Sequence, residues 1–178
     1  MTAVLPPTSP RASQTSKTYA GPLDWRTLVE WLSEDGVISR AEAQRTIARC
    51  AQVQSAQHAL IRLASVSMTR VADGKPLDIE TIAQWLAGRA GLNYLRIDPL
   101  KVDVGKVADT MSAVYAERHK VVPVQVTPLE VVIATSEPFV TDWVSEVERQ
   151  SRRSVRLVVA ITTSSGVTCT GNTLWRSA

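Results

Sequence analysis

The chain has 178 residues, 44% apolar and 21% charged, which allows an ordinary hydrophobic core in one domain or two small ones. A formal net charge of +3 is too small an excess to indicate nucleic-acid binding by itself. No apolar run approaches the roughly 20 residues of a membrane-spanning helix, and residues 1–10 lack the regions of a signal peptide. We therefore expect a cytoplasmic protein that does not span a membrane, and its two cysteines fit a reducing compartment.

The beginning of the chain predicts a flexible tail followed by a helical unit. Residues 1–20 are rich in Pro, Ser and Thr and lack an apolar period, so they cannot offset the entropy of ordering. The helical unit is expected over residues 21–72. Its first helix begins near Asp24 and is closed by Gly36 in a left-handed cap. The apolar stripe of this helix consists of Trp25, Leu28, Val29 and Leu32.

Two further helices are predicted in the same unit. Ser39 and Glu42 have the spacing of a capping box, which starts a second helix that ends at about Gln52. A third helix is predicted over 55–71 because apolar side chains recur there on one stripe.

A second unit, with both helices and strands, is placed at residues 73–161. Residues 72–76 form a polar break that predicts a linker before it. An amphipathic helix over 79–86 and a short strand over 94–97 come first. A fifth helix then follows, with one apolar face running without interruption over 104–115.

The end of this unit has the order strand, strand, helix, strand. Two β-branched runs, 121–126 and 130–135, predict neighbouring strands, and Pro123 places the first of them at a sheet edge because it cannot donate a ladder hydrogen bond. A sixth helix over 140–147 and a last strand over 155–161 complete the pattern. We predict an α+β fold, with a small N-terminal helical unit followed by an α/β layer whose small sheet ends ββαβ.

A search for catalytic chemistry in the sequence finds none. Gly166–Thr173 has the glycine spacing of a phosphate-binding loop, but Asn172 replaces its lysine and too few residues follow for the helix that would hold the phosphate. The cysteines and histidines are isolated from one another in the sequence, and they are Cys50, His58, His119 and Cys169. We therefore expect no catalytic residue, no bound nucleotide, no metal and no cofactor, and the chain is not expected to be an enzyme.

An arginine cluster raises the question of nucleic-acid binding. Its members are Arg149, Arg152, Arg153 and Arg156. A solvated helix end is the favoured interpretation, because nothing near it would recognise base edges, and we expect no nucleic-acid partner. Contact with a phosphate backbone is the open alternative, and it would show a steep salt dependence.

The tryptophans are more informative. Trp25 and Trp143 lie on apolar helix faces and are expected in the core. Trp31 and Trp85 each lie roughly 100° from the apolar stripe of their helices, so they are our candidates for contact with a partner protein, and Trp31 is expected to be mainly exposed. The alternative, left open here, is that each packs against another helix of the same chain.

From Leu77 onward the chain resembles the N-terminal domain of type II secretion and type IV pilus assembly ATPases, the GspE/PilB family. The matching stretches are Ala83–Ala87, Gly91–Leu95, Ile97–Pro99, Tyr115–Val124, Val132–Pro138 and Val158–Ala160. The resemblance implies a noncatalytic module that docks the ATPase onto the cytoplasmic domain of an inner-membrane platform protein. It also implies a location in the cytoplasm, peripheral to the inner membrane.

A weaker resemblance leaves an alternative function open. Residues 28–50 are similar to the helical repeat with which some members of this family bind cyclic di-GMP. Thr27, Val29 and Cys50 replace the Arg, Gly and Gln of that repeat, so we predict no binding at micromolar ligand. A cyclic di-GMP-binding regulatory module of the same family remains the alternative.

The last residues depart from the family. Residues 162–178 match none of its continuation and predict an atypical, disordered tail. A truncated or frame-altered end, or an appended tail, would explain this departure. Since no ATPase domain follows in this sequence, we do not expect ATP hydrolysis.

Overall fold

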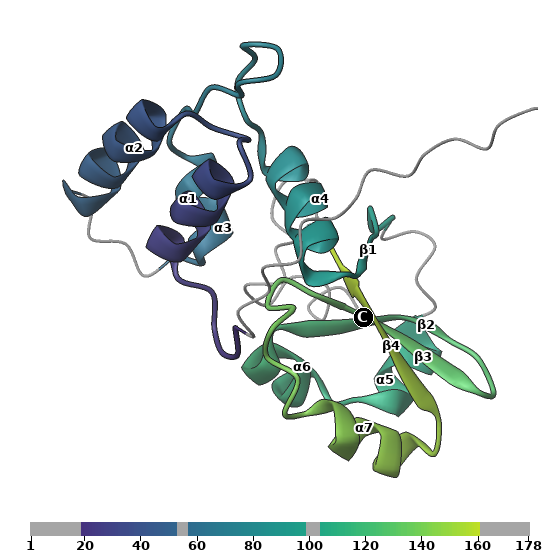
Figure 1. Ribbon diagram of the computed structural model, residues 1–178. Helices are drawn as coiled ribbons and strands as arrows, with labels where there is room; N and C mark the ends of the chain where they lie inside the picture. Colours follow the sequence, from purple (N-terminus) through teal and green to yellow (C-terminus); the bar gives the residue numbers. More distant parts are fainter. Residues whose placement is uncertain (1–18, 53–56, 99–103, 161–178) are drawn as a thin grey trace, which may run out of the picture.

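The computed structural model of the protein describes residues 19–52, 57–98 and 104–160. The helices are α1 (Trp25–Glu34), α2 (Arg40–Gln52), α3 (Ala59–Ala64), α4 (Ile79–Ala90), α5 (Val104–Thr110), α6 (Ala113–His119) and α7 (Val144–Ser151). The strands are β1 (Asn93–Tyr94), β2 (Val121–Val126), β3 (Glu130–Thr135) and β4 (Ser154–Val159). Figure 1 shows α1, α2 and α3 at one end of the molecule, with α4 between them and the sheet. The predicted α+β class is confirmed.

Some predicted segments cannot be compared with the structure. The tail predicted over residues 162–178, which contains Gly166–Thr173, lies outside the described residues. The tail predicted over residues 1–20 also lies outside them, apart from Tyr19 and Ala20.

The helix ends follow the capping signals of the sequence. The Asp24 carboxylate accepts hydrogen bonds from the amides of Arg26 and Thr27 at 3.0 and 3.2 Å, which starts α1. Gly36 follows α1 with φ of 70°, a left-handed conformation that favours glycine. The Ser39 hydroxyl accepts from the Glu42 amide at 3.1 Å and starts α2, as predicted.

Two helix predictions were wrong in length. The helix predicted over 55–71 is confined to α3. It ends there because the Ser65 hydroxyl donates a hydrogen bond to Arg62 O, and the chain after it forms an isolated β-bridge between Thr69 and Pro76. The helix predicted over 104–115 is two helices, because Ser112 caps a new one by accepting from the Tyr115 amide at 3.3 Å.

The four strands form one mixed sheet in the order β1-β4-β3-β2. β2 and β3 are antiparallel, whereas β4 is parallel to both β3 and β1. β2 lies at the edge, as Pro123 predicts, and its register with β3 shifts between Pro123 and Gln125.

The apolar side chains form several cores that meet at the sheet. One core joins α1, α2, α3 and α4 and includes Val159 at the end of β4. A second lies between the sheet and α6 and α7, and contains Ile133 and the buried Trp143. A third is built on β3 and β4 from residues such as Val132 and includes Ile97. Successive residues of β3 thus belong alternately to the second and the third core, so this strand is buried on both faces. Its sequence is a continuous apolar run for this reason.

Candidate docking surface

The structure brings the two candidate partner residues, Trp31 and Trp85, into one surface network. Asp35, just after α1, accepts from the indole Nε1 of Trp85 at 2.9 Å and from Arg89 Nη1 at 2.6 Å. The Arg89 guanidinium lies over the Trp31 ring at 4.5 Å from its centroid, and Arg89 also pairs with Glu34 at 3.4 Å. α1 and α4 therefore hold both indoles at fixed positions.

Trp31 also belongs to a group of three aromatic rings that we call the aromatic cluster, Tyr19, Trp31 and Phe139. Trp31 meets Tyr19 at 5.0 Å and Phe139 at 5.6 Å between ring centroids, with interplanar angles of 85° and 70°. Tyr19 and Phe139 meet at 5.5 Å and 79°. All three contacts are edge to face, the geometry that aromatic quadrupoles favour. The cluster joins α1 to the loop that follows β3.

The expectation that Trp31 is mainly exposed was wrong, because its side chain is half-buried, and that of Trp85 is half-buried too. A helical wheel reports the stripe of one helix only, and it missed Tyr19 and Phe139, which come from distant parts of the chain. Packing within the chain, the alternative left open by the sequence, is therefore present at both residues. Contact of Trp31 and Trp85 with a partner protein stays a prediction.

The other two tryptophans compared with the structure differ from each other. Trp143 is 2% exposed and lies in the core, as predicted. Trp25 is only half-buried, with the guanidinium groups of Arg26 and Arg62 at 5.0 and 4.6 Å from its ring centroid. It packs against the helical core with part of its surface open.

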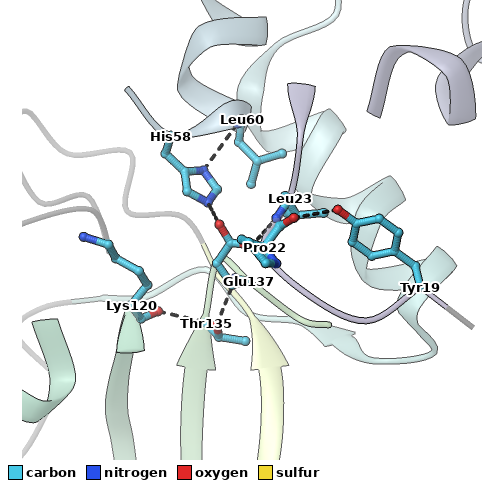
Figure 2. A network of polar contacts seen from close by, with 8 residues as sticks. All are labelled: Tyr19, Pro22, Leu23, His58, Leu60, Lys120, Thr135 and Glu137. Carbon is cyan, nitrogen blue, oxygen red and sulfur yellow. Dashed lines mark hydrogen bonds and ion pairs between the residues drawn. The ribbon is translucent and has the colours of Figure 1, made fainter. Parts of the chain in front are cut away.

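A buried polar network is centred on Glu137, and Figure 2 shows it together with Tyr19 of the aromatic cluster. One carboxylate oxygen of Glu137 lies 2.7 Å from His58 Nε2, and the other accepts from the Leu23 amide at 2.7 Å. The side chains of His58 and Glu137 are only 7% and 11% exposed. The Glu137 amide donates to the Thr135 hydroxyl at 2.9 Å. Glu137, two residues after the end of β3, thus joins the entry to α1 and the entry to α3 through its carboxylate and the sheet through its amide.

The hydrogen bonds of His58 determine its tautomer. The Leu60 amide donates to His58 Nδ1 at 3.3 Å, so Nδ1 carries no hydrogen and His58 caps α3. The hydrogen of the neutral ring then sits on Nε2 and is donated to Glu137. No signal in the sequence indicates this pair, since His58 and Glu137 are 79 positions apart and each looks isolated.

The side chains at the positions that correspond to the cyclic di-GMP repeat are mostly buried. Val29 and Cys50 are 0% and 1% exposed, and burial raises the pKa of the Cys50 thiol. Thr27 is half-buried. Nearby, a groove of about 380 Å³ between α1 and α2 has Glu30 and Glu34 on its wall, which disfavours an anionic ligand. The remaining residues of that wall are Ser33, Arg40, Ala43 and Gln44.

Two other residues singled out in the sequence, Arg156 and His119, make contacts within the chain. Arg156 of the arginine cluster pairs with Glu130 at 3.1 Å on the neighbouring strand. His119 ends α6, and its ring lies 4.3 Å from that of Tyr115. The pKa of Tyr115 is raised to about 12, mainly by burial and secondly by the hydrogen bond of its hydroxyl to Glu146. Within the described ranges, no group of three His, Cys, Asp or Glu side chains could hold a metal ion.

None of the helices that the structure describes combines the length and the apolar character that crossing a bilayer requires.

The chain is similar in sequence to known proteins. Residues 90–164 match the MshEN domain family. The chain is 37% identical over 135 residues to the type IV pilus assembly ATPase TfpB of Acinetobacter baylyi, a match that covers 74% of this chain and 23% of that protein. It therefore spans about a quarter of the length of the curated relative that it matches.

A solved structure has the same fold. The structure of MshE with cdg superimposes with a TM-score of 0.51 at 18% sequence identity, covering 75% of this chain and 88% of that one. The resemblance predicted from the sequence is thus confirmed: residues 90–164 match the MshEN domain family, the chain is similar to part of a type IV pilus assembly ATPase, and its fold is like that of MshE.

Proposed function

We propose that this chain is a noncatalytic docking module that binds the cytoplasmic domain of an inner-membrane platform protein. The relation to a type IV pilus assembly ATPase supports the assignment to a pilus or secretion system. The proposal includes a position in the cytoplasm at the inner membrane, and it includes the absence of ATP hydrolysis by this chain.

The observation that carries the proposal is the network in which Arg89 and Asp35 hold Trp31 and Trp85. Tryptophan and arginine are enriched among the residues that dominate binding energy at protein interfaces. Here two half-buried indoles are fixed by one aspartate and one arginine, so little side-chain entropy would be lost on binding. These features support the pair as the centre of a docking surface.

The test compares two tryptophans of the same helix. Trp31→Ala should weaken binding of the platform cytoplasmic domain by about 30-fold or more, which corresponds to about 2 kcal/mol. Trp25→Ala is the matched control, because Trp25 is also half-buried on α1 and also contacts an arginine. That arginine is Arg62, whereas Trp31 contacts Arg89. Trp25→Ala should leave the dissociation constant within threefold of the wild-type value. Equal losses for both variants, or no loss for Trp31→Ala in a folded protein, would contradict the docking assignment.

Binding of cyclic di-GMP is the alternative function, and the fold similarity to MshE solved with cdg favours it. Against it stand the buried side chains of Val29 and Cys50 and the acidic wall of the groove between α1 and α2. Isothermal titration with cyclic di-GMP should give no saturable signal at micromolar ligand. A one-site isotherm would establish the regulatory alternative instead.

A further inference from the structure

The segment Tyr19–Leu23, called the N-terminal strap below, lies across the junction between α1 and the loop after β3. The Gly21 amide donates to Phe139 O at 3.3 Å, and the Leu23 amide donates to the Glu137 carboxylate at 2.7 Å. Figure 2 shows the strap running from Leu23 beside Glu137 to Tyr19, whose side chain lies away from this network. The strap thus has a polar anchor at one end and an aromatic ring at the other.

The two ends of the strap are held by different forces. The Tyr19 hydroxyl donates to Pro22 O at 2.6 Å, inside the strap itself, and it is the ring that contacts Trp31 and Phe139. Aromatic pairs of this geometry contribute without directional hydrogen bonds, so another aromatic ring could take the same place. The buried Leu23–Glu137 bond holds the other end in position.

Gly21 separates these two ends and gives the strap a place to bend. Its φ is 126°, a conformation that side-chain-bearing residues rarely adopt, and a Cβ built on it would meet no atom within 4 Å. Tyr19 is half-buried and lies only two residues before this glycine. The ring can therefore leave Trp31 and Phe139 while Leu23 stays bound to Glu137, and bending at Gly21 breaks the hydrogen bond from its own amide to Phe139 O.

We propose that Trp31 and Phe139 form an acceptor for an aromatic side chain of the docking partner, and that Tyr19 fills this acceptor within the chain until the partner displaces it. This inference rests on the proposed docking function and adds the chemistry of the contact. The partner segment presents a Tyr or Phe ring edge-on to Trp31, as Tyr19 does at 5.0 Å. Because Tyr19 is tethered to the acceptor, its high effective concentration suppresses weak competitors.

The experiment uses the chain's own strap as a probe. A fluorescently labelled peptide with the sequence of residues 14–23 is titrated into the full chain and followed by anisotropy. Tyr19→Ala protein, whose acceptor is open, should bind this peptide at least tenfold more tightly than wild-type protein. Tyr19→Phe is the matched control, because it keeps the ring and loses only the hydroxyl bond to Pro22, and it should behave as the wild type.

Two further variants locate the binding. A peptide with alanine at the position of Tyr19 should bind none of the proteins, and Trp31→Leu placed in the Tyr19→Ala protein should abolish the gain. Circular dichroism checks that each protein is folded. The proposal is overturned if wild-type and Tyr19→Ala proteins bind the peptide equally, if Tyr19→Ala binds no peptide, or if the alanine peptide binds as well.

A parallel titration with the platform cytoplasmic domain separates this inference from the docking function. Tyr19→Ala should bind that domain at least threefold more tightly than the wild type. Equal binding by both proteins would overturn the competition while docking stands. If neither protein binds the domain, the docking function fails, and the peptide titration alone decides whether the acceptor exists.

Discussion

The carboxylate of Glu137 provides a sharp test of how the helical part of the chain is attached to the sheet. Glu137→Gln keeps the shape of the side chain but replaces one acceptor oxygen with an NH₂ group. Two fixed donors face this side chain, the Leu23 amide and His58 Nε2. A glutamine has one oxygen to offer them, so one donor must face the new NH₂ group.

A change of histidine tautomer cannot relieve this conflict. Moving the hydrogen to His58 Nδ1 would let Nε2 accept from the glutamine, but Nδ1 would then oppose the Leu60 amide that it now accepts from. One buried donor is left without a partner in either arrangement, which costs about 1–3 kcal/mol. Glu137→Ala leaves both donors without a partner, and we expect it to lower the free energy of unfolding by about 2–5 kcal/mol.

Urea unfolding followed by circular dichroism measures these losses. The unfolding midpoint should fall in the order wild type, Glu137→Gln, Glu137→Ala, with an unchanged denaturant slope. Glu30→Gln is the control, because Glu30 is exposed on α1 and its replacement should change stability by less than about 0.5 kcal/mol. If Glu137→Gln unfolds at the wild-type midpoint, the deduced tautomer and the role of the network are wrong.

Two further predictions concern the core and the response to alkaline pH. Leu28 is 0% exposed, so Leu28→Ala should lower the free energy of unfolding by roughly 2–5 kcal/mol in the same assay. The Trp31 ring is half-buried, so Trp31→Ala should lower it by about 2 kcal/mol, whereas an exposed ring would imply a loss of less than about 1 kcal/mol. A Leu28→Ala loss no larger than that of Trp31→Ala would contradict this ranking. Burial raises the pKa of Tyr115 from 10.0 to about 12. The contribution of Tyr115 to stability is therefore complete below pH 10 and is lost as the pH rises from about 10 towards 12. Above pH 10 the wild type should lose stability more steeply than Tyr115→Phe, and parallel curves would refute this.

Local signals in the sequence predicted much of the fold. Asp24 and Ser39 accept amide hydrogens at helix starts, and Gly36 adopts the left-handed conformation, because these effects depend on neighbouring residues only. Pro123 likewise predicted the sheet edge, since a missing amide excludes a central strand. The helix predicted over 55–71 was too long because burial of Met68 continued the apolar stripe after the backbone had left the helix.

The candidate site could be predicted only in part. Trp31 and Trp85 were selected from their helical positions, and the structure links them through Asp35. Their actual exposure depends on rings such as Phe139 that tertiary folding brings in, and no local pattern contains this information. The pairing of His58 with Glu137 is of the same kind, because neither residue has a partner nearby in the sequence.

Binding of the platform protein to the face formed by α1 and α4 can be followed by amide hydrogen exchange with and without the platform cytoplasmic domain. We expect slower exchange on binding over residues 25–35 and 79–90, centred on Trp31 and Trp85, with no change in α7. Protection confined to α7 and β4, or no protection at a saturating concentration of the domain, would contradict it.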